Sequence, residues 1–65
     1  MTVEEIVEEI VTRYRHVTEV LSRGKGTWPE HHYVRDDTWS AWRAEQAALM
    51  SLHHYITGEY PATKT

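Results

Sequence analysis

Histidines are the most visible chemical feature of this 65-residue chain, which has five of them. Four stand in two adjacent pairs, His31-His32 and His53-His54. Neighbouring residues on a helix point about 100° apart, so the second pair does not converge on one ion, and no HxxxH or HExxH spacing occurs. We therefore predict no metal site. A loop site from either histidine of the first pair with Glu30 or Asp36 stays open as an alternative.

Glu45 is a second candidate for chemistry, because it lies between Trp42 and Leu49 on one face of a predicted helix. An unpaired buried carboxylate is destabilising, so we expect a cationic partner in the same or a neighbouring chain. The candidates are Arg13, Arg15 and His16. A general base is the alternative, but no nucleophile, metal motif or oxyanion loop accompanies Glu45, and the chain has no cysteine. We predict a non-enzymatic protein without a cofactor.

An anion site is suggested near the middle of the chain. Arg35 and Thr38 place a guanidinium and a hydroxyl beside the free amides of a predicted helix N-terminus, where phosphate binds readily. Asp36 and Asp37 support the alternative of ordinary capping, because they can occupy these amides and repel an anion. The preceding loop adds a cation and two rings able to stack on bases. The predicted ligand-binding set is Arg35, Thr38, Lys25, Trp28 and Tyr33.

Two amphipathic helices must position these residues. The first is predicted over about residues 3–23, where apolar side chains recur at alternating steps of four and three. They are Val3, Val7, Ile10, Tyr14, Val17 and Leu21. Thr2 and Glu5 have the spacing of a capping box at its start, and Gly24 is a left-handed stop.

The second helix is predicted over about residues 37–57, with Asp36 or Asp37 as its N-cap and Gly58 as its stop. Its expected inner face comprises Ala41, Trp42, Ala48, Leu49, Leu52, Tyr55 and Ile56. Trp39, Met50 and His53 fall on another side and indicate a second contact surface. The intervening loop, residues 24–35, is long for a helix connection, so its aromatic residues either cap the bundle or take a ligand.

Small size favours self-assembly, since a chain this short without cysteine holds only a marginal core. We predict an all-α fold, a two-helix antiparallel hairpin that assembles into a homo-oligomeric helical bundle. Residues 1–61 form its single domain and residues 62–65 a flexible tail. The predicted interface residues are Val7, Ile10, Tyr14, Val17, Leu21, Trp39, Trp42, Leu49, Met50, Leu52 and Tyr55.

Charge and hydropathy restrict the location and the partners. No apolar stretch is long enough to span a bilayer, and the acidic N-terminus differs from a signal peptide, so we expect a cytoplasmic protein. A net charge of −3 argues against general nucleic-acid binding. The four acids of residues 1–12 contrast with the net positive charge of residues 13–35, which favours binding of a small anion near the turn.

The start of the second helix resembles a known family. The run Arg35-Asp36-Asp37-Thr38, followed by Ser40, Arg43, Glu45 and Ala47, is similar to the second-helix pattern of phage anti-CBASS sponges and related hairpin domains of anti-Thoeris proteins. The similarity covers about twenty residues, of which Arg35 and Thr38 match the family motif. Trp39 and Trp42 depart from it, at positions where aliphatic residues are expected.

This resemblance implies a small phage-type protein that sequesters cyclic oligonucleotide immune signals as a homo-oligomer, without cleaving them. The alternative is a protein–protein interaction module, or an inhibitor that docks on a host protein through the second helix. The partners expected from the sequence are therefore further copies of the chain together with a cyclic nucleotide or a host protein.

Overall fold

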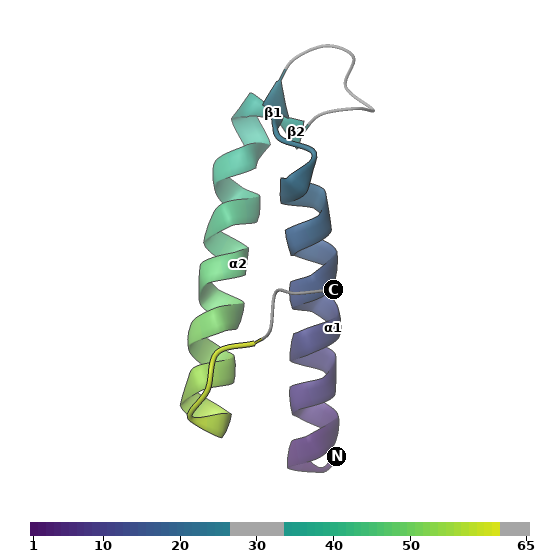
Figure 1. Cartoon of the computed structure of the whole chain (residues 1–65), viewed down its shortest axis with the longest axis vertical. Coiled ribbons are helices and arrows are strands. Elements are labelled where there is room, and N and C mark those ends of the chain that lie inside the picture. Colours follow the sequence, from purple (N-terminus) through teal and green to yellow (C-terminus); the bar gives the residue numbers. More distant parts are fainter. Residues whose placement is uncertain (27–33, 62–65) are drawn as a thin grey trace.

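Two antiparallel helices form the body of the molecule. The computed structural model describes residues 1–26 and 34–61, with helix α1 at Val3–Ser22 and helix α2 at Asp36–Thr57. The helices lie side by side along the long axis (Figure 1), as expected for an all-α hairpin. The predicted ligand residues Trp28 and Tyr33 and the predicted tail lie outside the described residues.

Both ends of α1 follow from local sequence. The Thr2 amide donates to Glu5 Oε1 at 2.8 Å, and the Glu5 amide donates to Thr2 Oγ1 at 3.2 Å, so the expected capping box is confirmed. Gly24 has a φ of 76°, and its amide donates to the Leu21 carbonyl at 3.0 Å. The left-handed stop at this glycine is therefore also confirmed.

The start of α2 differs from the expectation. The N-cap is Arg35, whose backbone is extended and whose side chain makes no capping hydrogen bond, so the prediction of an aspartate cap was wrong. Asp37 lies inside the first helical turn, and its carboxylate accepts from the Arg35 guanidinium at 2.9 Å instead. The end of α2 agrees with the expectation, since Gly58 has a φ of 80° and donates to the His54 carbonyl.

Two very short strands close the hairpin next to the helix ends. Strand β1, Lys25–Gly26, pairs in parallel with β2, Val34–Arg35, with Lys25 opposite Val34 and Gly26 opposite Arg35. Val34 is 6% exposed, and its amide donates to the Gly24 carbonyl at 2.9 Å. The sequence predicted a loop throughout this region. A two-residue strand is too short to show the alternation by which strands are recognised.

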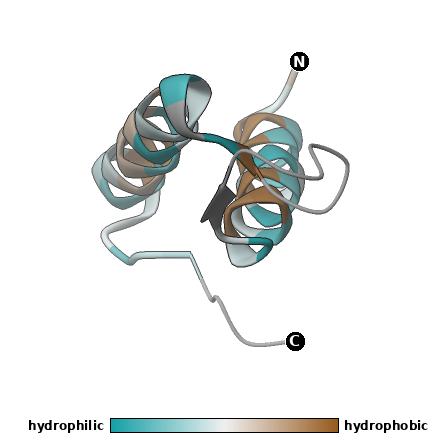
Figure 2. Ribbon diagram, turned by 90° about the horizontal axis from the view of Figure 1, so that it is seen from above, coloured by the Kyte–Doolittle hydropathy of each residue, from teal (hydrophilic) through white to brown (hydrophobic). Residues whose placement is uncertain are grey.

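The core lies between the helices and under β2. Among the described residues, its buried hydrophobic side chains are Ile10, Tyr14, Val17, Val20 and Val34. Tyr14 and Val17 are fully buried, whereas Val7 and Leu21 are half-buried. Seen from above, the helices stand as two columns in a single layer, and α1 carries the more hydrophobic residues (Figure 2). The stripe predicted for the first helix therefore forms most of the core.

The faces of α2 are divided differently from the prediction. The buried or half-buried positions are Trp39, Trp42, Glu45, Gln46, Leu49, Met50, His53 and Ile56. Trp39, Met50 and His53 were expected on a separate contact surface, but they belong to this inner side. Ala41, Ala48, Leu52 and Tyr55 were expected on the inner side, but all four are exposed. The broad apolar content of α2 is compatible with either orientation, so contacts with α1 determine it.

The segment after α2 turns back along one side of the helical layer (Figures 1 and 2). His53 is 9% exposed, and its Nδ1 donates to the Glu59 carbonyl at 2.6 Å. The His54 ring stacks on Tyr60 with centroids 4.5 Å apart, and Pro61 is buried. The second histidine pair therefore anchors this segment. Within the described residues, neither helix is long and apolar enough to cross a membrane.

Candidate interaction surface

The outer side of α2 carries a continuous exposed face without a charged side chain. We call it the α2 outer face, and its exposed members are Ser40, Ala41, Ala44, Ala47, Ala48, Ser51, Leu52 and Tyr55. At about 100° per residue they cover roughly 140° of the helix circumference. Solvent-facing helix sides are normally polar and charged, so a small and apolar side of this width is typical of a contact surface.

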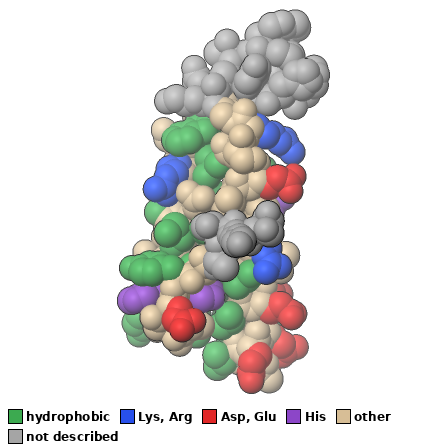
Figure 3. All heavy atoms as spheres, viewed as in Figure 1, with side chains coloured by type: hydrophobic (Ala, Val, Ile, Leu, Met, Phe, Trp, Pro, Cys, Tyr) green, Lys and Arg blue, Asp and Glu red, His purple; other side chains and the backbone are tan. Residues whose placement is uncertain are grey.

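The two largest side chains of this surface are widely exposed. Leu52 is 45% exposed and Tyr55 is 87% exposed. Figure 3 shows hydrophobic side chains along the α2 side of the molecule, whereas acidic side chains gather along the N-terminal part of α1. The two helices therefore present chemically different surfaces, and the apolar one belongs to α2.

A regular spacing underlies the α2 outer face. Five of its members recur at alternating steps of three and four residues, namely Ala41, Ala44, Ala48, Ser51 and Tyr55. This is the heptad spacing of a helix that packs along another helix. Most of these side chains are small, so a second helix can approach the α2 backbone closely. Only Tyr55 was among the predicted interface residues. The alternating steps were the available signal for the others.

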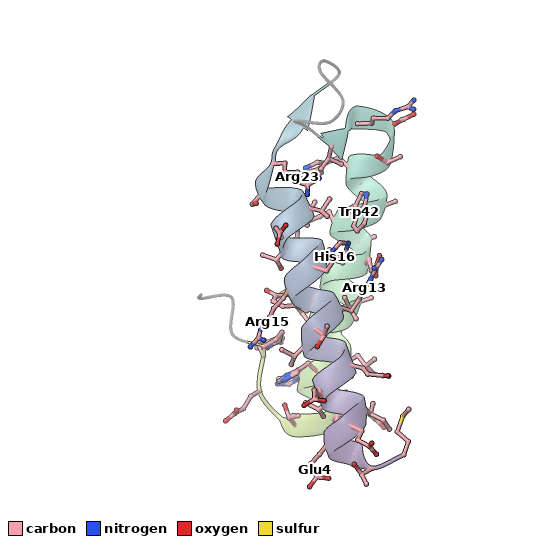
Figure 4. The ribbon with its side chains drawn as sticks, turned by 90° about the vertical axis from the view of Figure 1, so that its right-hand side faces the viewer. Glu4, Arg13, Arg15, His16, Arg23 and Trp42 are labelled. Atoms are coloured by element: carbon pink, nitrogen blue, oxygen red, sulfur yellow. The ribbon has the colours of Figure 1, made fainter. Side chains whose placement is uncertain are left out.

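An ion pair crosses between the helices at one edge of this face. Arg13 Nε donates to Glu45 Oε2 at 2.5 Å, and Arg13 Nη2 donates to Glu45 Oε1 at 3.0 Å. The Arg13 guanidinium also lies over the Trp42 ring, 5.5 Å from its centroid. In Figure 4, Arg13, His16 and Trp42 lie together between the helices, and Arg15 points to the other side. Of the three expected partners of Glu45, the structure selects Arg13.

Electrostatics make this pair a fixed structural contact. The hydrogen bond from Arg13 lowers the pKa of Glu45, while burial acts in the opposite direction and the charges of Arg13 and His16 lower it further. The same contact raises the pKa of Arg13. Glu45 therefore stays ionised at neutral pH, which suits a residue that fixes the register of the two helices rather than a general base.

The predicted anion site is only partly described. The Arg35 guanidinium pairs with Asp37 at 2.9 Å, and the Thr38 hydroxyl donates to the Arg35 carbonyl at 3.1 Å. Both predicted ligand groups are thus engaged within the first turn of α2. The backbone of Lys25 lies next to this turn through the β1–β2 pairing, but its side chain lies outside the described part of the chain.

Other polar clusters are shallow or already engaged. A depression on α1 is lined by Glu8, Glu9, Thr12, Arg13 and His16. Its residues come from one side of a single helix, and its arginine is committed to Glu45. Within residues 1–26 and 34–61, no three His, Cys, Asp or Glu side chains gather in a way that could hold a metal ion. Glu30, His31 and His32, the alternative loop ligands, lie outside these ranges.

The predicted interface residues fall into two groups. Most are buried or half-buried between the helices of one chain: Val7, Ile10, Tyr14, Val17, Leu21, Trp39, Trp42, Leu49 and Met50. Leu52 and Tyr55 are exposed on the α2 outer face. Comparison of the chain with protein-family models, with curated proteins and with solved structures finds no match.

Proposed function

We propose that this chain is a non-enzymatic, cytoplasmic helical module that assembles with copies of itself through the α2 outer face. The observation that carries the proposal is the exposed, charge-free face from Ser40 to Tyr55. It occurs in a chain whose described residues bury only five hydrophobic side chains. Covering this face with a second copy removes apolar surface from water, which stabilises the small fold.

The energetics favour a reversible complex. Alanine loses no side-chain conformational entropy on burial, so the N-terminal part of the face packs at little entropic cost. Leu52 and Tyr55 supply most of the apolar area. The face spans about 21 Å along the helix at 1.5 Å per residue, so one such contact falls below the roughly 1,200 Å² of a standard interface. We therefore expect assembly to depend on protein concentration.

Sedimentation velocity over a concentration series tests this proposal. Ala48→Glu places a charge at the centre of the α2 outer face and should shift the protein to monomer. Thr12→Glu is the matched control, because Thr12 is equally exposed on a helix but lies outside the face. It should sediment like the wild-type chain, and circular dichroism should show unchanged helix content in both variants. Monomeric wild-type protein at every concentration would instead favour docking on a host protein.

A second candidate function is the binding of a cyclic oligonucleotide. The observation that favours it is the β1–β2 pairing, which sets Gly26 opposite Arg35 at the N-terminal end of α2. Arg35 and Thr38 lie at this positive end of the helix dipole, where a phosphate can replace Asp37 as the partner of the guanidinium. In this role the assembled chain sequesters an immune signal of the class implied by the resemblance.

Calorimetric titration with cyclic dinucleotides and trinucleotides tests this second function. Arg35→Gln should abolish the binding heat, since it removes the charged partner of the phosphate. Arg43→Gln is the matched control, because Arg43 is an exposed arginine of the same helix, two turns further along. Absence of heat with the wild-type chain at high protein concentration would reject nucleotide binding and leave self-assembly untouched.

A further inference from the structure

Side-chain size changes systematically along the α2 outer face. Its N-terminal half carries the small residues Ala41 and Ala44, and Ala48 stands at its middle. Its C-terminal half carries Leu52 and Tyr55, which are 45% and 87% exposed. The face is therefore low at one end and raised at the other.

This gradient distinguishes the two ways in which a helix can pair with its own copy. In a parallel pair, Tyr55 meets the partner's Tyr55, and Ala41 meets the partner's Ala41. The aromatic rings then hold the helices apart at one end, and the alanines leave a gap at the other. In an antiparallel pair, each raised half meets a low half, so contact is continuous. Protein interfaces pack as densely as interiors, which favours the continuous arrangement.

Helix electrostatics favour the same direction. Antiparallel neighbours place the positive N-terminal end of one helix beside the negative C-terminal end of the other. The edges of the face are also compatible with either copy, because Glu45 is already neutralised by Arg13 within its own chain. No unpaired carboxylate is therefore brought into the contact by this edge.

We infer that two copies pair through α2 in antiparallel orientation about a two-fold axis close to Ala48. Leu52 and Tyr55 of each copy then cover Ala41 and Ala44 of the other. The inference rests on the proposed self-assembly and adds its orientation and its contacting residues. The interface uses the same patch on both copies, so it closes after two chains and produces a four-helix arrangement with the two α2 helices at its centre.

Engineered disulfides test the orientation, and the cysteine-free chain provides a clean background. Ala41→Cys and Tyr55→Cys are mixed, one carrying a mass tag, and oxidised. A disulfide needs Cα atoms within about 7 Å. Positions 41 and 55 lie about 21 Å apart along the helix, so antiparallel pairing brings position 41 of one copy to position 55 of the other and separates like positions. Intact-mass analysis should show the mixed disulfide at least fivefold above either like pair.

A second pair and a control protect this test. Ala44→Cys mixed with Leu52→Cys keeps Tyr55 in place and should again give the mixed disulfide. Thr12→Cys, exposed on α1, should remain unlinked and reports random collision. Dominant like pairs, 41 with 41 and 55 with 55, in a sample that sediments as a dimer would overturn the orientation alone. Monomeric protein before oxidation would overturn the proposed self-assembly as well.

Discussion

Replacement of Val17 by alanine tests whether the small core between α1 and α2 holds the fold together. Val17 is 0% exposed, so the change removes two buried methyl groups, worth about 1.6 kcal/mol of transfer free energy. The cavity left behind adds about 1 kcal/mol. Alanine regains about 0.5 kcal/mol through its higher helix propensity. The free energy of unfolding should therefore fall by about 2 kcal/mol, a large part of the stability of a domain this small.

Val3→Ala is the matched control, because it makes the same chemical change in the same helix at a position that is 61% exposed. The smaller loss of burial and the gain in helix propensity nearly cancel there, so the change should stay within about 0.5 kcal/mol of wild type. Urea unfolding followed by circular dichroism, at one protein concentration, measures both variants. Equal effects of the two substitutions would refute the assignment of the core.

Three further predictions concern individual contacts. Glu45→Gln should make the thermal midpoint less sensitive to acid, because the lowered pKa of Glu45 stabilises the fold at neutral pH and that contribution is lost as the pH falls below the ordinary glutamate value of about 4.3; unchanged acid sensitivity would contradict the ion pair. Gly58→Ala should reduce stability by about 1 kcal/mol in urea unfolding, since its φ of 80° disfavours a side chain although the space is open. Thr2→Ala should reduce it by about 1 kcal/mol and speed amide exchange at Glu5, whereas unaltered exchange would contradict the capping box.

The sequence was sufficient where local chemistry decides the structure. The capping box of Thr2 and Glu5 and the left-handed stops at Gly24 and Gly58 depend on a few neighbouring residues, and each is present as expected. The stripe of α1 was equally clear, because its apolar residues fall on one side and its acids on the other. The need of Glu45 for a cationic partner followed from the cost of burying a charge.

The sequence was insufficient where long-range contacts decide. Apolar and small residues surround much of α2, so its inner side is chosen by contacts with α1, such as the hydrogen bond from Gln46 to Thr18. The β1–β2 pairing is too short to leave a pattern. The anchoring of the terminal segment by His53 depends on a chain reversal after Gly58. For the same reason the α2 outer face became visible only once the inner side was known.

Self-assembly is tested most directly by native mass spectrometry of the freshly purified chain over a range of concentrations. This measurement reports the number of subunits and any retained small molecule together. Pairing through the α2 outer face predicts a closed dimer that grows in proportion as the concentration rises. An additional mass of nucleotide size on that dimer would support the second candidate function. A bare monomer at every concentration would contradict self-assembly through α2.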